Sequence, residues 1–137
     1  MARILVVDDE PDILLLLRMN LEAEGHEVLL AADGEMALAR IAEHRPDLVL
    51  LDVMMPLRDG WGVLEAIDGE GRAVVMVSAK ADPRDAQRAL ELGALDYLTK
   101  PFDLDKLLAV VDEQLARTPA ERQAARDLAL RELAGPG

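Results

Sequence analysis

The sequence contains no cysteine, which excludes disulfide bonds and zinc sites built on cysteine. Aromatic residues make up only 2% of the chain, so any core has to be built from aliphatic side chains. Basic residues number 15 against 27 acidic ones, and the net charge of −12 argues against binding to nucleic acid or to an anionic membrane surface. No apolar run approaches the roughly 18 residues of a membrane span, and no signal-peptide pattern is visible. We therefore expect a cytoplasmic protein.

What the sequence does contain is a regular alternation of short apolar runs and longer amphipathic segments. With 137 residues, 51% of them hydrophobic, the chain is long enough for one domain with a substantial core. The apolar runs are residues 4–7, 28–31, 48–51, 74–77 and 94–98, and the amphipathic segments are 11–24, 34–43, 60–67, 83–92 and 104–117. Because short runs that are apolar on both faces are typical of buried parallel strands, the alternation predicts an α/β fold with an open, doubly wound parallel sheet.

The boundaries of the predicted helices carry recognisable signals. Side chains that can accept a hydrogen bond from the first helical turn stand before several segments, and glycine follows others. Helix caps are expected at Asp33, Asp82, Asp103 and Thr118, and helix ends at Gly25 and Gly93. Proline follows Asp82 and Thr118 directly, in the first helical position where it is tolerated.

Residues 118–137 stand apart from this alternation, so we divide the chain into a domain of residues 1–117 and a C-terminal helical extension or linker. Thr118 and Glu121 have the spacing of a capping box, which predicts a helix that runs to about Leu133. The apolar stripe of this helix is thin, and we favour a solvated or linker helix. The alternatives are a helix that leads into an effector domain and a helix that pairs with another subunit.

Polar side chains gather where the predicted strands end. Asp8 and Asp9 follow the first strand, Asp52 the third, Ser78 the fourth and Lys100 the fifth. Ligands of parallel sheets bind at the carboxyl ends of the strands, where the strand order reverses. If the order is 2-1-3-4-5, the three aspartates converge, with the serine and the lysine beside them.

These residue types are suited to handling a phosphoryl group. Carboxylates that converge repel one another unless a hard cation such as Mg²⁺ compensates them. A lysine and a hydroxyl can then contact phosphoryl oxygens, and one carboxylate can accept the phosphoryl group itself. Asp52 is the best candidate for the acceptor, because the residues after it do not resemble a helix start. Taken alone, each residue could be a helix cap or an ordinary surface group; the combination is what predicts the site.

The same segments resemble the receiver domain of bacterial two-component response regulators over roughly residues 2–117. The motifs are VVDDEP at 6–11, LLDVMMP at 50–56 with DG at 59–60, VSA at 77–79 and DYLTKPF at 96–102. The resemblance implies a flavodoxin-like fold with five strands in the order 2-1-3-4-5 and five helices. It also implies phosphorelay signalling, in which a sensor histidine kinase or a phosphotransfer protein donates to Asp52.

The resemblance assigns further roles residue by residue. It implies that Mg²⁺ is held by Asp8, Asp9, Asp52 and the backbone carbonyl of Met54. Lys100 contacts the phosphoryl group, and the Lys100–Pro101 peptide is cis. Ser78 is the switch hydroxyl, and Tyr97 is the switch aromatic that turns inward on phosphorylation. The face of residues 83–117 is then repacked for partner binding or for a homodimer that depends on phosphorylation.

Several alternatives remain open. The chain departs from DNA-binding regulators of this type at Leu95-Asp96 and Val110, where two aspartates and an arginine commonly support a salt-bridged dimer. The apolar run 13–17 is either a wide core stripe, which we slightly favour, or a docking surface for the kinase. The chain is not expected to be an enzyme: self-dephosphorylation should be slow, because the apolar Met54 cannot orient water. A phosphatase of the haloacid-dehalogenase type and a flavin or nucleotide carrier fit less well, since Asp52 lacks a second acid two residues on and the loops lack a glycine-rich phosphate cradle.

Overall fold

The structure, a computed structural model, describes residues 2–67, 73–79 and 82–134 of the chain. Its strands are β1 (Arg3–Val7), β2 (Glu27–Ala31), β3 (Leu48–Asp52), β4 (Ala73–Ser78) and β5 (Asp96–Thr99). Its helices are α1 (Pro11–Ala23), α2 (Gly34–His44), α3 (Gly60–Ala66), α4 (Pro83–Glu91), α5 (Leu104–Ala116) and α6 (Pro119–Ala134). Strands and helices alternate as the hydrophobic pattern predicts, with boundaries that shift by one or two residues. No helix in this part of the chain is both long and apolar enough to cross a membrane.

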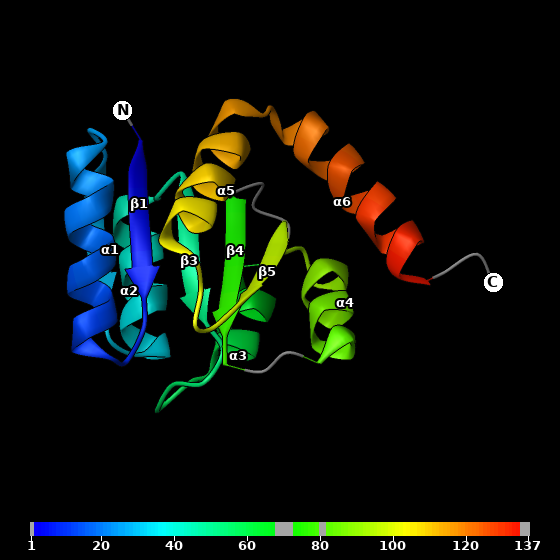
Figure 1. Ribbon diagram of the computed structural model, residues 1–137. Helices are drawn as coiled ribbons and strands as arrows, with labels where there is room; N and C mark the ends of the chain where they lie inside the picture. The colour runs from blue at the N-terminus through cyan, green and yellow to red at the C-terminus, as the bar shows by residue number, and fades with distance from the viewer. Residues whose placement is uncertain (1, 68–72, 80–81, 135–137) are drawn as a thin grey trace.

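The strands form one parallel sheet in the order β2-β1-β3-β4-β5, which confirms the predicted topology. Figure 1 shows α1 and α5 on one face of the sheet, with α2, α3 and α4 on the other. The direction of winding reverses between β1 and β3. The carboxyl ends of these two strands therefore lie side by side at the edge where ligands bind to such sheets.

The sheet separates two aliphatic cores. Every residue of β3 and β4 is buried, because helices cover both faces of these central strands. One core joins alternate strand residues to α1 and α5 through side chains such as Leu17 and Leu107. The other joins the opposite strand residues to α2, α3 and α4 through Ile41, Leu64 and Ala89. Burying aliphatic side chains on both faces fixes the register of the strands, and so fixes the positions of the residues that follow them.

The predicted helix caps are present. The side chains of Asp33, Asp82 and Asp103 accept hydrogen bonds from backbone N–H groups in the first turns of α2, α4 and α5. Gly25 and Gly93 have φ angles of 90° and 109°, the left-handed conformation that glycine adopts readily at helix ends.

Helix α6 begins where the capping box predicts, but it does not extend away from the sheet. The Thr118 hydroxyl accepts a hydrogen bond from the Glu121 N–H, and the Glu121 carboxylate accepts one from the Thr118 N–H. The helix then runs back alongside α4 (Figure 1). The interpretation as a solvated helix therefore holds only for its outer face. The thin apolar stripe gave no sign of this contact, because much of the inner face is polar.

Candidate functional site

Two buried carboxylates lie at the reversal point of the sheet. Asp8 follows β1 and Asp52 ends β3, and the register pairs Val7 with Leu51 directly before them. Only 3% of Asp8 and 4% of Asp52 is exposed. Carboxylates are seldom this buried unless they are paired with a cation or coordinate a metal. The apolar strands thus bring two charges from distant parts of the sequence to one point.

Lys100 supplies positive charge between these carboxylates. Its Nζ lies 2.8 Å from Asp8 Oδ2, 3.5 Å from Asp52 Oδ2 and 3.2 Å from Glu10 Oε1. The backbone N–H of Lys100 also donates to the Ser78 carbonyl at 2.7 Å, and the Lys100–Pro101 peptide is cis. The lysine side chain is 13% exposed, so water screens these ion pairs less than it would on the surface.

Burial disfavours both the Asp52 carboxylate and the Lys100 ammonium, but neighbouring charges offset this cost only for the lysine. Burial raises the pKa of Asp52 from its ordinary value of 3.8 to about 6, and the charge of Asp8 adds to the increase, while Lys100 and the Met54 N–H oppose it. Burial also works against the Lys100 ammonium, yet its contacts with Asp8 and Asp52 outweigh this and raise the pKa of Lys100. The lysine therefore stays charged, while Asp52 remains a carboxylate whose charge is only partly compensated.

Three acidic side chains that could hold a metal ion lie close together beside Lys100. Carboxylate oxygens of Asp8, Asp9 and Glu10 all lie within 4.8 Å of one another. Glu10 occupies the N-cap position of α1, but its side chain makes no capping hydrogen bond and contacts Lys100 instead. Sequence reasoning did not assign Glu10 to the site. Pro11 gave no signal either way, because Asp82 also precedes a proline and does cap its helix.

The predicted switch residues lie on the other side of Asp52. Ser78 is fully buried at the end of β4, one residue beyond Val77, which pairs with Asp52 across the sheet. Burial raises the pKa of Tyr97, and a side-chain hydrogen bond with Ser78 opposes this effect. The two predicted switch residues are therefore hydrogen-bonded to each other in this structure, and an inward turn of Tyr97 on phosphorylation stays a prediction.

The loop after β3 is held close to Asp52. The Met54 N–H donates to Asp52 Oδ1 at 3.4 Å, and the Gly60 N–H donates to the Val53 carbonyl at 2.8 Å. A Cβ atom on Gly60 would lie 2.3 Å from the backbone oxygen of Asp52, so only glycine allows the chain to pass this closely. The Met54 side chain, two residues after Asp52, is 56% exposed. The surface near this loop therefore includes an apolar side chain.

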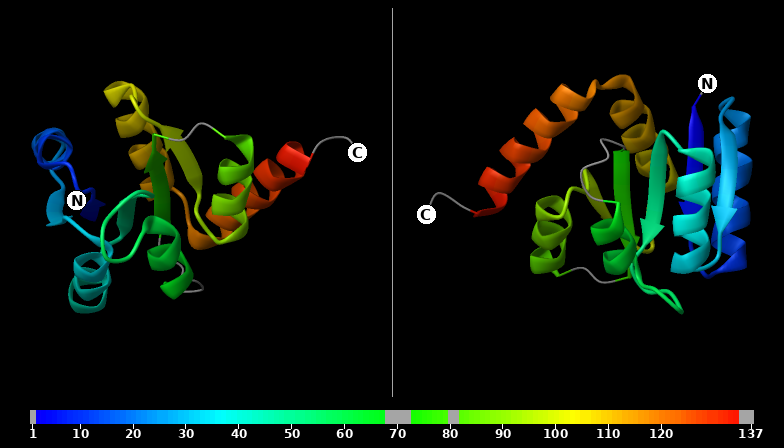
Figure 2. Two further views of the ribbon diagram at one scale, coloured as in Figure 1. Left: turned by 90° about the horizontal axis from the view of Figure 1, so that it is seen from below. Right: turned by 180° about the vertical axis from the view of Figure 1, so that it is seen from behind.

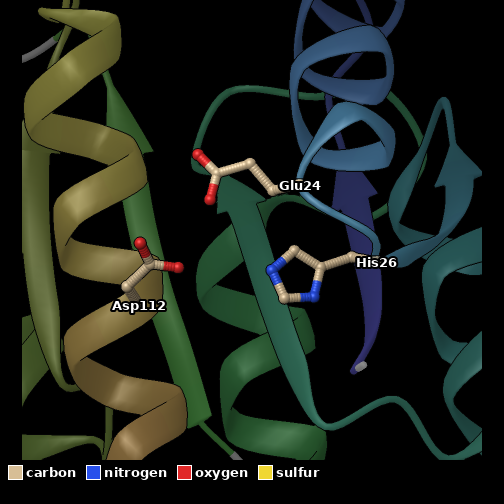
Figure 3. Close-up of side chains that lie close together, drawn as sticks. All are labelled: Glu24, His26 and Asp112. Carbon is tan, nitrogen blue, oxygen red and sulfur yellow. The ribbon is translucent and has the colours of Figure 1, made fainter.

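A second group of potential metal ligands comprises Glu24, His26 and Asp112 (Figure 3). The Nδ1 atom of His26 accepts a hydrogen bond from the Ala2 N–H at 3.3 Å, so a neutral ring carries its proton on Nε2. Nε2 is the nitrogen that faces the two carboxylates. A metal needs that nitrogen free of its proton, and ligating histidines donate through the other nitrogen. This group is therefore poorly arranged for a metal.

The described site combines three features. It has the buried Asp52 carboxylate, a lysine that stays charged and a group of acidic oxygens suited to a hard cation. The buried Ser78 is within one strand position of Asp52. This combination can bring an anionic phosphoryl group to Asp52 and stabilise the charge that develops during its transfer.

Comparison with known proteins gives a consistent result. The family model described as the response regulator receiver domain matches residues 4–112. The transcriptional regulatory protein KdpE of Mycobacterium tuberculosis is 44% identical over 121 residues, which cover 88% of this chain and 54% of KdpE. The chain spans about half the length of the curated relatives it matches. These matches favour the resemblance over the phosphatase and carrier alternatives.

Solved structures agree with the sequence matches. The receiver domain of the Francisella response regulator 1452 aligns with a TM-score of 0.80 and 31% identity, covering 84% of this chain and 97% of its own. A two-component response regulator from Clostridium difficile aligns with a TM-score of 0.82 and 30% identity, covering 85% and 98%.

Proposed function

This chain belongs to the family of response regulator receiver domains, and on that premise we propose that Asp52 accepts a phosphoryl group from a histidine kinase or a phosphotransfer protein. The receiver unit comprises residues 1–117, with 118–137 as its extension. The observation that carries the proposal is the position of Lys100 Nζ, which contacts Asp8, Glu10 and the buried Asp52 at the carboxyl edge of the sheet.

The transfer is a substitution at phosphorus. A carboxylate oxygen of Asp52 attacks, a new P–O bond forms, and the P–N bond to the donor histidine breaks with its electron pair leaving on the imidazole. The Lys100 ammonium contacts the transferred group and offsets its negative charge. The Ser78 hydroxyl donates a hydrogen bond to a phosphoryl oxygen.

Asp8, Asp9, Asp52 and the Met54 carbonyl are the proposed ligands of Mg²⁺, and Glu10 is close enough to assist. The carboxylate oxygens of Asp8, Asp9 and Glu10, which lie within 4.8 Å of one another, are hard donors of the kind that this ion prefers. When bound, Mg²⁺ supplies charge neutralisation at the phosphoryl oxygens. Lys100 Nζ already lies 2.8 Å from Asp8 Oδ2, so a bound ion would share the Asp8 carboxylate with the lysine.

The mass of the intact protein after incubation with acetyl phosphate tests this function. The native chain should gain one phosphoryl group with Mg²⁺ and none with a chelator. Asp52→Asn should gain none. Asp59→Asn is the matched control, because Asp59 lies in the same loop and only caps α3. A phosphoryl gain by D52N equal to that of D59N would contradict the proposal.

Helix α1 offers a contact surface for the phosphoryl donor. Leu15, Leu16 and Met19 are 57%, 40% and 62% exposed, so two leucines of the apolar run 13–17 lie outside a core stripe. An apolar patch on a helix that begins beside Asp9 is suited to packing against a helix of the donor protein.

Replacing Leu15 and Leu16 by glutamine tests this contact. We expect slower transfer from a phosphohistidine protein but unchanged loading from acetyl phosphate, which needs no docking. Leu128→Gln removes an equally exposed leucine from α6 and should change neither rate. Unchanged transfer from the protein donor in a folded L15Q/L16Q variant would eliminate the contact.

A further inference from the structure

In the described part of the chain, α1 is the one helix that begins without a side-chain cap. Glu10 stands at its N-cap position, but the carboxylate makes no capping hydrogen bond and its Oε1 lies 3.2 Å from Lys100 Nζ. Glutamate is not among the residues that helices prefer at this position. The Glu10 side chain is therefore engaged with the lysine and not with the helix. The side chains that cap the other helices are those of Asp33, Asp59, Asp82, Asp103 and Thr118.

The backbone of Glu10 is fixed where β1 passes into α1. The left view of Figure 2 looks onto this carboxyl edge of the sheet. The Glu10 N–H donates to Asp8 Oδ1 at 2.9 Å, and the Glu10 carbonyl accepts from the N–H groups of Ile13 and Leu14 at 3.1 and 3.2 Å. Pro11 restricts the residue before it to extended backbone, and Glu10 has a φ of −91° and a ψ of 113°. The Glu10 side chain thus starts from a defined point beside Asp8.

The Lys100 ammonium has three N–H donors, and three carboxylates surround it. Its Nζ lies 2.8 Å from Asp8, 3.2 Å from Glu10 and 3.5 Å from Asp52. The two shorter contacts are both with residues that follow β1. The longest contact is with the carboxylate that is proposed to accept the phosphoryl group. Asp8 and Glu10 together therefore determine where the ammonium lies relative to Asp52.

We propose that Glu10 is a positioning residue, which with Asp8 keeps the Lys100 ammonium in place for transfer to Asp52. This inference rests on the proposed function of Asp52. A lysine is a point charge on a flexible stem, so its effect on a phosphoryl group depends on where its ammonium is held. With Asp8 and Glu10 each accepting one N–H, the third N–H is left for the transferred group. The Glu10 side chain is 61% exposed, so water weakens the contact and its effect is a moderate one.

Two substitutions of Glu10 separate its contact with Lys100 from its charge. Glu10→Asp keeps the charge and provides a good helix cap, but it is one methylene group shorter and loses the contact. Glu10→Gln keeps the length and loses the charge. Asp12→Asn is the matched control, because Asp12 is an exposed acid in the first turn of the same helix.

The rate of mass gain of the full-length protein with acetyl phosphate measures the effect on transfer. Each variant is compared over a range of Mg²⁺ concentrations, so that the rate at saturating Mg²⁺ is separated from the concentration of the ion that is needed. At saturating Mg²⁺, E10D and E10Q should gain the phosphoryl group about two- to fivefold more slowly than the native chain. D12N should gain it at the native rate.

NMR of the lysine side chains tests the contact without any phosphoryl donor or metal. The chain contains only Lys80, Lys100 and Lys106, so labelling lysine with carbon-13 at Cε gives three signals, and a Lys100→Met sample assigns the one from Lys100. This signal should shift in E10D and in E10Q and should stay in place in D12N. A purely structural role of Glu10 in α1 would leave the signal unmoved in E10D, which caps the helix.

The outcomes separate the positioning role from the other roles that Glu10 could have. An E10D variant with the native rate and an unmoved Lys100 signal would overturn the proposal. Equal slowing in D12N and E10Q would assign the effect to net charge, and slowing only at low Mg²⁺ would make Glu10 a ligand of the ion; either result would overturn positioning. A native chain that gains no mass would refute the proposed function and the role of Glu10 in transfer, while the lysine signal would still decide whether Glu10 holds Lys100.

Discussion

Replacing Asp52 by asparagine should stabilise the metal-free protein while abolishing its function. Asparagine has nearly the same shape as aspartate but carries no charge. In the native chain the Asp52 carboxylate is 4% exposed, and burial together with the charge of Asp8 raises its pKa from 3.8 to about 6. A raised pKa of an acid means that its charged form costs the folded state free energy, and the substitution removes that cost.

The size and the pH range follow from the two pKa values. A difference between 3.8 and about 6 corresponds to about 3 kcal/mol, at about 1.4 kcal/mol per unit. The folded state binds more protons than the unfolded state within this range. The stability that proton binding contributes is complete below pH 3.8 and is lost as the pH rises through about 6. The advantage of D52N should therefore be about 2–3 kcal/mol above pH 6 and should shrink as the pH falls toward 3.8.

Urea unfolding followed by far-UV circular dichroism, with a chelator present, measures this difference. Asp59→Asn is the control, since asparagine caps a helix as well as aspartate does and should shift stability little at any pH. A D52N variant no more stable than the native chain above pH 6 would refute the electrostatic reasoning. So would a gain that stays constant as the pH is lowered.

Three further substitutions test other parts of the site. Lys100→Met should destabilise the metal-free protein by about 2–3 kcal/mol, because it leaves Asp8 and Asp52 without a cation. In the same urea assay, Mg²⁺ should restore more stability to this variant than to the native chain. Lys106→Met, at an exposed lysine, is the control. Gly60→Ala should cost about 1–3 kcal/mol and reduce phosphorylation, since its Cβ would lie 2.3 Å from a backbone oxygen. Gly62→Ala should cost less, because its Cβ would meet side chains instead, at 2.9 Å from Arg58 Cγ and 3.6 Å from Asp59 Oδ1. The aspartyl phosphate should be long-lived in the native chain and decay faster in Met54→Gln, whose amide can orient water, but not in Leu57→Gln, an exposed residue of the same loop. Equal decay in M54Q and the native protein would remove Met54 from that role.

The sheet and its acidic edge could be predicted because local patterns determine them. Runs such as 48–51 are apolar on both faces and too short for a buried helix, which favours a buried strand, and the side chain that follows then lies at the edge of the sheet. Once the strand order was inferred, Asp8 and Asp52 had to be neighbours, and the structure places them on either side of Lys100.

What the sequence did not reveal depends on long-range packing. Glu10 has the position of a helix cap, and its contact with Lys100 depends on the lysine side chain, which follows β5 but reaches the residues after β1. The return of α6 rests on Arg122 and on small alanines, and polar side chains on a helix usually indicate solvent. Val110, which stands where related regulators commonly carry an arginine of a salt-bridged dimer, is 8% exposed and belongs to the core beneath α5.

The most direct test of the central claim is to identify the residue that carries the phosphoryl group. Borohydride reduces an acyl phosphate to an alcohol, so a phosphorylated aspartate becomes homoserine. After incubation of the native chain with acetyl phosphate and Mg²⁺, reduction and peptide mass mapping should find homoserine at position 52. Homoserine at Asp8, Asp9 or Asp59 instead, or at none of the aspartates of a chain that has gained the phosphoryl mass, would contradict the account.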